Sequence, residues 1–528
     1  MAYRSSFSTQ ISMDDSSDRL TDRQKNVVLH SWAKGFSEKV FPAIDSNAFK
    51  VLYEDNRASR PATPANYMIG ALLIKEMFGL TDDETVEMVQ CDVRTQYALH
   101  STSLSEQPIS DRTFSRFRER LYNYEQETGI DLLKIEMEKI ADRFCEYLKI
   151  NKKLKRMDSL MVAMHAKTMS RLEIIYTTVQ KCAKLLKNSG KEDLIPEEMR
   201  HYLDPDDLNE VIYYAKDEDV TPRLQKAIDE ALQMKKIMDS DDWYGTAEYQ
   251  LLLRVVNEQA ENGKPKDKSQ IRSDSLQNPN DPDATFRKKA GKNHQGYVGN
   301  IVEAVGDEGA SQIIVFDYAK NTHADQDFSR AYLSENQDET MIADGAYGSV
   351  ELQELADEKN INLVTTCLTG KDPDEVFGEF KLNEAGTAVI TCPKGHEAVE
   401  SQYYPKNQMI RAKMNLEDCS NCPFKERCKA KLQKETAAVM VSKKMVMRAQ
   451  YLKKLGTDEY VQLSRKRNAV EGIMSVLRRR FHVDDIPVFG KQRSKVFFYF
   501  KVGAFNVVKL LRHMPEEAEK NEYETAIA

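Results

Sequence analysis

One glutamate, Glu471, stands within a basic stretch that runs from Ser464 to Phe481. The apolar residues of this stretch recur at the spacing of one helix face; they are Val470, Ile473, Met474, Leu477 and Phe481. The cations around the glutamate are Arg465, Lys466, Arg467, Arg478, Arg479 and Arg480. A carboxylate among cations can bind a metal ion while the cations bind phosphates. The stretch therefore predicts a helix that could take part in phosphoryl-transfer chemistry.

Two aspartates far upstream could complete such a metal site. Asp158 and Asp344 each close a short apolar stretch, the first beginning at Leu154 and the second at Glu339. In an open α/β sheet the carboxyl ends of the strands face one crevice, so acids distant in sequence converge there. Two Mg²⁺ ions about 4 Å apart, bound by carboxylates, can stabilise both the attacking and the leaving oxygen of an in-line phosphoryl transfer.

Each acid also has an ordinary structural explanation. Asp344 and Gly345 form an Asp-Gly pair, which is common in tight turns. Asp158 could simply cap the end of a strand, and Glu471 could simply form a salt bridge with Arg467, four residues earlier on the same helix face. The order of the three acids and the positive charge around Glu471 favour the shared metal site.

The distribution of charge favours a partner rich in phosphate. The chain carries a net charge of −8. Between Lys443 and Arg512 it has 17 Lys and Arg and 5 Asp and Glu, a local net charge of +12, so the remainder carries −20. Concentrated positive charge is typical of a nucleic-acid-binding face, and a solvated surface is the alternative.

Length and hydropathy predict a multidomain protein without a membrane span. A chain of 528 residues is too long for one core and should hold roughly two to four domains. We find no apolar run of about 18 residues, the length that a membrane span needs. The first 20 residues lack the apolar core of a signal peptide. We therefore expect a cytoplasmic protein.

Residues 1–150 are expected to form a helical N-terminal domain. The stretch from Tyr67 to Phe78 predicts an amphipathic helix that ends at Gly79, and Thr81 is a typical N-cap of the next helix. Another helix opens at Ser110 and carries arginines on one side. Short helices with a basic last member indicate either a helix-turn-helix-like module that contacts DNA or a helical dimerisation or scaffold domain.

Further along, strands alternate with helices, which is the order of an α/β sheet. The expected strands are residues 154–164, 299–305, 312–316, 339–344 and 361–365. The expected helices are residues 325–333 and 349–359, the Glu471 helix, and an apolar helix from Lys495 to Leu511. Between the first two strands lie a helical region, residues 170–260, and a polar linker, residues 262–296. The acidic tail, residues 515–528, is expected to be disordered.

Four of the eight cysteines fall close together in a segment, residues 368–445, where the alternation of strands and helices breaks. They are Cys392, Cys419, Cys422 and Cys428. In a cytoplasmic chain such a cluster favours a metal over disulfides. Four thiolates could close a tetrahedral structural Zn²⁺ site, with His396 as an alternative ligand. Reduced thiols without a metal are the other possibility.

At several positions the sequence resembles bacterial insertion-sequence transposases of the DDE, RNase H-like superfamily. The resemblance spans about residues 25–513 and points in particular to the IS-eleven-eighty-two group, with a long helical stretch between the first two acids. The helical N-terminal domain is matched by Phe49 to Tyr53, Arg60-Pro61 and the helix from Tyr67. The later motifs are matched by Met157-Asp158-Ser159 with Met169 to Glu173, Asp281 to Arg287 with Gly296-Tyr297, Ile342 to Ser349, and Arg467 to Glu471.

The wider superfamily has a signature of Tyr, two residues, Arg, three residues, Glu, six residues and Lys. Arg467 and Glu471 match its Arg and Glu, and Arg478 keeps a cation at the Lys position. Ser464 stands at the Tyr position, which puts any contact of that phenol in doubt. Tyr460, about one helical turn earlier, is the candidate substitute.

The resemblance implies an α/β fold with an RNase H-like core, a mixed sheet flanked by helices, formed by residues 151–170 and 295–514. The rest of the chain is then a helical N-terminal domain, 1–150, a helical insertion with its linker, 171–294, a Cys-containing insertion within the core, 368–445, and the acidic tail, 515–528.

The resemblance also implies a DNA transposase. Such an enzyme binds the terminal inverted repeats of its own insertion sequence, cleaves the DNA strands with two Mg²⁺ (or Mn²⁺) ions, and joins them to target DNA. The predicted catalytic metal ligands are Asp158, Asp344 and Glu471. The predicted phosphate-binding residues are Arg467, Arg478, Lys466, Arg479 and Arg480. Concerted cleavage of two ends suggests a homodimer on DNA. The alternatives are a metal-dependent nuclease without strand transfer and a non-catalytic DNA-binding protein derived from a transposase.

Overall fold

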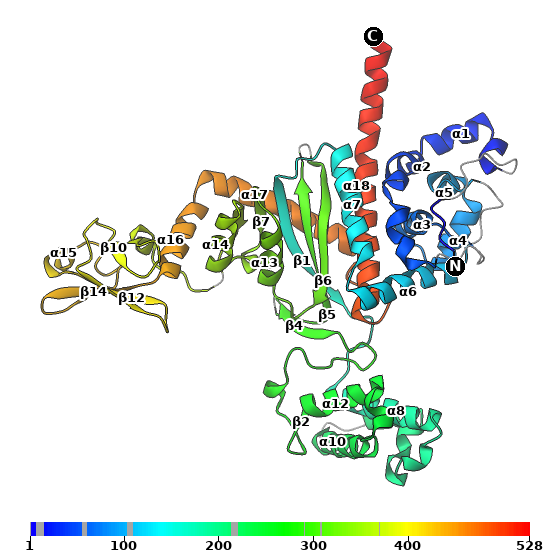
Figure 1. Ribbon diagram of the computed structural model, residues 1–528, viewed down its shortest axis with the longest axis horizontal. Helices are drawn as coiled ribbons and strands as arrows, with labels where there is room; N and C mark the ends of the chain where they lie inside the picture. The colour runs from blue at the N-terminus through cyan, green and yellow to red at the C-terminus, as the bar shows by residue number, and fades with distance from the viewer. Residues whose placement is uncertain are drawn as a thin grey trace.

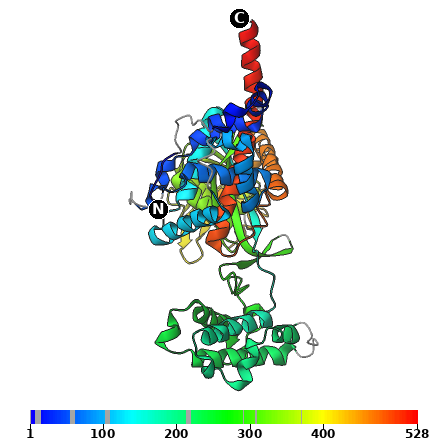
Figure 2. The ribbon, with the colours of Figure 1, turned by 90° about the vertical axis from the view of Figure 1, so that its right-hand side faces the viewer.

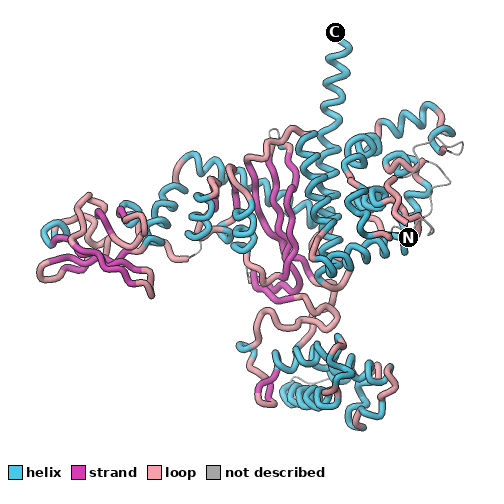
Figure 3. The backbone as a smooth tube through the Cα atoms, viewed as in Figure 1, coloured by secondary structure: helices cyan, strands magenta, loops and turns pink. Residues whose placement is uncertain are grey.

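A mixed β-sheet lies at the centre of the molecule, with helices on both of its faces (Figure 1). The computed structural model describes the chain except residues 1, 7–14, 55–60, 103–108, 213–219, 290, 307–308, 369 and 528, and it describes no side chains for residues 468–469 and 514–527. Helical N-terminal segments, a separate helical unit and a smaller unit with its own strands surround the central sheet (Figure 3).

The central sheet contains the strands that the alternating pattern predicts. They are β1 (Leu154–Ala163), β5 (Lys292–Val305), β6 (Ser311–Lys320), β7 (Thr340–Ala343) and β8 (Asn362–Thr365). Their order in the sheet is β6-β5-β1-β7-β8, so that in chain order they are arranged 3-2-1-4-5. β5 runs antiparallel to both of its neighbours, whereas β7 and β8 run parallel to β1. The predicted mixed sheet is therefore confirmed.

Helices cover both faces of this sheet. They are α13 (Asp325–Glu335) and α14 (Val350–Glu358) on one face and α17 (Asp458–Phe481) and α18 (Lys491–Ile527) on the other. Alternate residues of a strand point to opposite faces. Met157 and Met161 accordingly pack with α13 and α14, whereas Leu160 and Val162 pack with α17 and α18. Asp158 has the same parity as Leu160 and therefore lies on the α17 face.

The helices before β1 are α1 (Asp22–Leu29), α2 (Trp32–Gly35), α3 (Ala65–Phe78), α4 (Asp82–Cys91), α5 (Val93–Ala98), α6 (Asp111–Thr128) and α7 (Leu132–Tyr147). The predicted ends are confirmed, since α3 stops at Gly79 with φ of +68° and Thr81 caps α4. The prediction of one apolar face for α3 is wrong, because α3 is buried on nearly all sides and packs against α18. Its buried Glu76 is paired with Lys75 and with Lys501 of α18, both at 2.9 Å.

A helical unit with its own hydrophobic core separates β1 from β5 in the chain. Its helices are α8 (Arg171–Asn188), α9 (Asp207–Ile212), α10 (Val220–Ile237), α11 (Asp241–Tyr244) and α12 (Ala247–Gln259). Their apolar residues pack on one another in a cluster distinct from that of the sheet. Figure 2 shows the unit set apart from the rest of the molecule. The predicted helical character of this region is confirmed.

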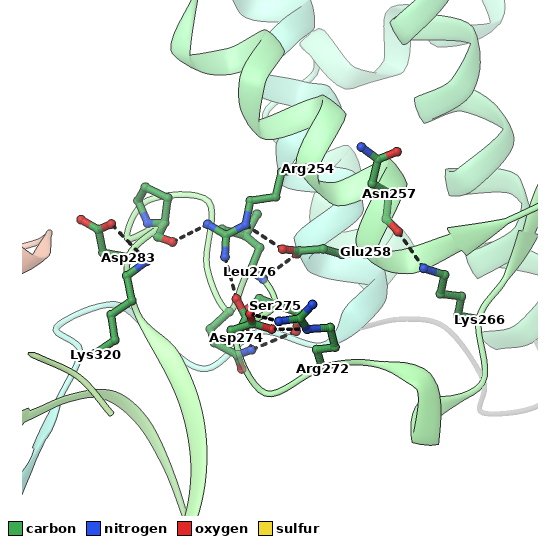
Figure 4. Close-up of polar contacts among 12 residues, drawn as sticks. Arg254, Asn257, Glu258, Lys266, Arg272, Asp274, Ser275, Leu276, Asp283 and Lys320 are labelled. Carbon is green, nitrogen blue, oxygen red and sulfur yellow. Dashed lines mark hydrogen bonds and ion pairs between the residues drawn. The ribbon is translucent and has the colours of Figure 1, made fainter. Parts of the chain in front are cut away.

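The connection from this unit to the sheet is attached to α12 by polar contacts (Figure 4). Arg254 donates to the carbonyl oxygens of Pro282, at 2.6 Å, and Asp274, at 2.9 Å. Glu258 accepts from the backbone N–H of Leu276 at 2.7 Å. The polar connection is therefore an ordered path, although most of it lacks regular secondary structure apart from the short pair β2 (Ala260–Glu261) and β3 (Lys264–Pro265).

The predicted linker is wrong over its last residues. β4 (Thr285–Lys289) pairs with the first part of β5, so that residues 285–289 and 292–296 form the two arms of an antiparallel hairpin. The polar side chains of this segment give no alternating apolar pattern. Its extended form comes from backbone pairing with its partner strand, and sequence periodicity does not detect such pairing.

The segment with the clustered cysteines forms a small unit with a core of its own, visible at the far left of Figure 1. Its strands are β9 (Lys381–Leu382), β10 (Val389–Thr391), β11 (Glu400–Tyr404), β12 (Met409–Asn415), β13 (Lys431–Leu432) and β14 (Thr436–Val441). β11, β12, β14 and β13 form an antiparallel sheet in that order. α15 (Leu416–Ser420) follows β12, and α16 (Lys443–Leu455) connects the unit to α17.

The acidic tail continues α18, which extends to Ile527. The sequence predicts disorder there, and the backbone is helical instead; Glu, Ala and Lys, which dominate the tail, have high helix propensity. No helix in the part of the chain that the structure describes is both long enough and apolar enough to cross a membrane.

Candidate active site

Asp158 and Asp344 lie side by side on neighbouring strands. β1 and β7 are parallel, and Met157 is the register partner of Ala343. Asp158 and Asp344 are the next residues on each strand, so they occupy equivalent positions in the sheet. Parallel strands in this register direct equivalent side chains to the same face. That face is the one covered by α17, the helix that carries Glu471.

The local structure around Asp344 directs one carboxylate oxygen outward. Its Oδ1 accepts hydrogen bonds from the backbone N–H of Gly345, at 2.6 Å, and from the hydroxyl of Thr366, at 3.1 Å. Its Oδ2 lies 3.7 Å from Nη2 of Arg467. The turn predicted at Asp344-Gly345 is therefore present, and it holds the carboxylate with Oδ2 turned toward α17.

Asp158 lies in the interior of β1, so the prediction that it stands at the end of a strand is wrong. Its carboxylate is half-buried and near several charges. Its Oδ1 accepts from the N–H of Ser159 at 2.8 Å. Burial raises the pKa of Asp158, and this rise is opposed by that hydrogen bond and by the positive charges of Arg467 and Lys289. The negative charge of Asp344 raises the pKa of Asp158 further. The two aspartates therefore share one electrostatic environment with Arg467.

Arg467 also contacts the third acid. Its Nη1 lies 3.5 Å from Oε1 of Glu471, whose side chain is 65% exposed. The salt bridge between Glu471 and Arg467, which was the alternative explanation for the position of Glu471, is thus present. The guanidinium of Arg467 reaches Asp344 as well. Arg467 joins the acid on α17 to the acid after β7, and the structure brings all three carboxylates to one face of the sheet.

The apolar stripe predicted on α17 is confirmed, since each of its members is buried against the sheet or α18. The predicted cations Lys466, Arg478, Arg479 and Arg480 are exposed. α17 thus buries its apolar face and presents its cations to solvent beside Glu471.

Tyr460 does not lie with this group. It is buried, and its hydroxyl donates to the side chain of Asn362 at 3.0 Å. Asn362 begins β8, whereas Asp344 follows the end of the neighbouring parallel strand. The suggestion that Tyr460 replaces the signature tyrosine is therefore wrong, because its side chain packs at the opposite end of the strands.

The structure adds a second polar cluster that sequence reasoning missed. Asp325 is almost completely buried, and its Oδ1 accepts from the hydroxyl of Ser159 at 3.1 Å. Its Oδ2 lies 3.3 Å from Arg287 and 3.7 Å from Lys289. The signal that could have revealed the cluster is the run Arg287-Lys288-Lys289, which the interpretation as a linker passed over.

The four clustered cysteines line one small cavity of about 20 Å³, together with His396 and Asp418. None of the four forms a disulfide. Burial raises the pKa of Cys428 to about 12, and the other three thiols add to the rise. His396 Nδ1 lies 3.4 Å from Asp418. The structure therefore brings the predicted thiols together from the end of β10, from α15 and from the turns that follow α15.

Within the described part of the chain, no group of three or more His, Cys, Asp or Glu side chains is already arranged around one metal position. At the carboxylates the reason is visible, because the guanidinium of Arg467 lies within 4 Å of both Asp344 and Glu471. A cation bound by all three acids would have to displace this guanidinium.

Comparison with known families identifies two segments. Residues 391–511 match the Transposase DDE domain, and residues 28–120 match the Transposase domain (DUF772). No curated protein and no solved structure matches the chain. The first match includes Glu471 and the clustered cysteines, and a DDE domain implies an enzyme that acts on nucleic acid, with DNA as the partner. Two segments of the chain are therefore similar to transposase domains, one of them the DDE domain, and these matches support an insertion-sequence DDE transposase.

Proposed function

We propose that the protein binds the terminal inverted repeats of its own insertion sequence and catalyses metal-dependent strand cleavage and strand transfer with Asp158, Asp344 and Glu471. The observation that carries the proposal is the meeting of these carboxylates, from β1, the end of β7 and α17, around Arg467. The strand order 3-2-1-4-5, with its second strand antiparallel, supports an RNase H-like core. The helical unit between the first two acids supports the IS-eleven-eighty-two group.

The donor set fits divalent cations that prefer oxygen ligands. Asp344 has its Oδ2 free of backbone donors, and Glu471 is exposed on the same face. Burial disfavours the negative charge of Asp158, so a nearby cation would stabilise that charge. These features suit two Mg²⁺ or Mn²⁺ ions. Bound there, the ions would activate a water or 3′-hydroxyl and stabilise the leaving oxygen.

The chain's own residues orient the reacting groups. The N–H of Gly345 and the hydroxyl of Thr366 donate to Oδ1 of Asp344 and so fix its carboxylate. The N–H of Ser159 fixes the carboxylate of Asp158 in the same way. Once it leaves the carboxylates, the guanidinium of Arg467 can donate two parallel hydrogen bonds to a DNA phosphate. The carboxylates and the phosphate-binding cation would then act at one position on the backbone.

Phosphate contacts should come mainly from the exposed cations of α17, namely Lys466, Arg478, Arg479 and Arg480. Such contacts make binding weaken steeply with salt. We propose that the N-terminal helices, which match a transposase domain, make the sequence-specific contacts with the inverted repeats. Cleavage of two ends in concert would require two copies of the chain, so we propose a homodimer on DNA.

The proposal is tested with end-labelled duplex DNA that carries the inverted repeats flanking the reading frame. Incubation with Mg²⁺ should yield cuts at the repeat ends and joined products with target DNA. Cutting without dependence on the repeats and without joining would favour a nuclease. Binding without any cutting would favour a non-catalytic DNA-binding protein. If no inverted repeats flank the reading frame in the genome, the proposed transposase function would be contradicted before any assay.

We also propose that Cys392, Cys419, Cys422 and Cys428 bind one structural Zn²⁺. The support is their shared cavity of about 20 Å³, which all four cysteines line and which is too small for an organic ligand. In the described part of the chain the thiols are not yet arranged around one metal position, so zinc binding would draw them closer together. Zinc favours thiolate ligands in tetrahedral sites without an open position. The small unit has a limited core of its own, so a bound metal would stabilise it further.

Zinc analysis of protein purified without metal-affinity steps should give about one equivalent per chain. Cys419→Ser should lower this value well below one and should lower the melting temperature of the protein. Cys91→Ser is the matched control, since Cys91 is exposed and lies far from the cavity in sequence. A wild-type content well under one equivalent would show that the thiols are simply reduced.

A further inference from the structure

The hairpin formed by residues 285–296 is strongly basic. It contains four Lys or Arg residues and no Asp or Glu. Lys289 is the direct cross-strand partner of Lys292, and Arg287 is the partner of His294. Like charges directly opposite each other in an antiparallel pair are destabilising. The hairpin therefore keeps an unfavourable charge pairing, which an anion bound along it would relieve.

A buried acid compensates part of this charge. The side chain of Asp325 is 2% exposed and lies close to the cationic groups of Arg287 and Lys289, while Ser159 donates to its other oxygen. One carboxylate thus faces two cations, and the cluster retains a positive excess. Lys289 is the more exposed of the two cations, with 39% of its side chain accessible. Its ammonium is held near the surface with capacity for a further anionic partner.

Lys289 lies beside β1, where it contacts a side chain on the α13 face of the sheet. Its Nζ lies 3.4 Å from the hydroxyl of Ser159, the residue that follows Asp158. The charge of Lys289 also opposes the rise in pKa that burial gives Asp158, as does the charge of Arg467. A cation of the hairpin therefore lies beside the strand that carries Asp158.

One histidine of the hairpin is influenced by cations of both the hairpin and α17. Burial lowers the pKa of His294, and the charges of Lys289, Lys292, Arg478 and Arg287 lower it further. Arg478 belongs to α17, whereas the others belong to the hairpin. Cations from two elements distant in sequence thus act on the same imidazole.

We propose that the β4–β5 hairpin is a second phosphate-binding surface for DNA. Lys289 contacts a backbone phosphate of the DNA strand that is bound near Asp158, and Asp325 positions Lys289 for this contact. This inference rests on the proposed action on DNA and adds to it a binding element outside α17. Lysine is suited to this role, because its ammonium is a compact charge on a flexible stem that can follow a phosphate.

The test is the salt dependence of binding to duplex DNA carrying the inverted repeats, measured without divalent cations. Each phosphate neutralised by a protein cation contributes about −0.9 to the slope of log K against log salt concentration. Lys289→Gln should therefore make the slope shallower by about 0.9, and Lys289→Arg should restore it. If Lys289→Gln fails to fold, Lys292→Gln, at the exposed end of the hairpin, provides the same measurement.

Lys288→Gln is the matched control. Lys288 has the same charge and is exposed, but as the preceding residue on β4 it points away from Ser159 and Asp325. In Lys288→Gln, the slope of log K against log salt concentration should change by less than half as much as it does in Lys289→Gln. Equal changes in the two variants would mean a general effect of charge and would overturn the specific contact.

The role of Asp325 is tested by coupling. If Asp325 positions Lys289, the effect of Lys289→Gln on DNA affinity should shrink in an Asp325→Asn background. If Asp325 has a purely structural role, Asp325→Asn would lower the melting temperature and leave the effect of Lys289→Gln unchanged.

Two outcomes separate this inference from the proposed function. Wild-type protein that neither binds nor cuts the DNA would contradict the proposed function. Wild-type protein that is active, together with an unchanged slope in Lys289→Gln, would contradict the hairpin inference alone.

Discussion

Replacing Asp344 with asparagine should lower Mg²⁺-dependent cleavage of end-bearing DNA by at least about 1,000-fold, equivalent to roughly 4 kcal/mol of activation free energy. The fold should survive, because the amide oxygen of asparagine can still accept from the N–H of Gly345 and the hydroxyl of Thr366. What is lost is the charge on the oxygen that faces Arg467. Cleavage rates with the labelled substrate, alongside its binding constant, measure the effect.

The control for this variant is Asp338→Asn. Asp338 is exposed, precedes the same strand β7 at its other end, and has a positive φ of 58° that asparagine tolerates. Its cleavage rate should stay within about twofold of wild type. Retained cleavage in Asp344→Asn would remove Asp344 from the proposed set of metal ligands, whatever the behaviour of the control.

The second large effect is expected at Leu477. This residue of α17 is fully buried, at 0% exposure, in the core that joins α17 to the sheet and α18. Leu477→Ala should destabilise this core by about 2–5 kcal/mol, because it removes buried methyl groups and leaves a cavity. Since the same helix carries Glu471 and Arg467, cleavage should fall with stability. Thermal unfolding and the cleavage rate below the melting transition report both effects.

Val476→Ala is the comparison, since Val476 is the preceding residue on α17 and is 39% exposed. Its truncation should change stability by less than about 1 kcal/mol. Equal losses in the two variants would contradict the orientation of α17 and would place its apolar stripe away from the core.

The parts of the fold that sequence predicts well are those whose signal is local. The spacing of Val470 to Phe481 gives the buried face of α17, and Gly79 and Thr81 give the boundary between α3 and α4. α3 shows the limit of this reasoning, because burial on nearly all sides depends on α18, more than 400 residues later in the chain. In the sequence, Lys75 and Glu76 of α3 resemble a solvent-exposed helix face. In the structure they are buried, and Glu76 is paired with Lys75 and Lys501.

The candidate site was predictable in its residue types and only partly in its arrangement. Asp158, Asp344 and Glu471 were selected by order and local context, but their proximity depends on the register of β1 with β7 and on the packing of α17. Asp325 gave no usable signal, since it resembles the first residue of a helix, and the basic run that contains Lys289 lies in a polar segment interpreted as a linker. Only strand pairing places them beside Ser159.

The packing of α3 against α18 also has a consequence for how the protein is made on the ribosome. During translation the N-terminal helices emerge early, yet the helix that covers them is synthesised after every strand of the central sheet. Contacts between such distant segments form slowly and leave apolar surface exposed until they form. Nascent chains should therefore depend on chaperones until α18 has left the exit tunnel, and messages truncated before α18 should yield polypeptides that aggregate.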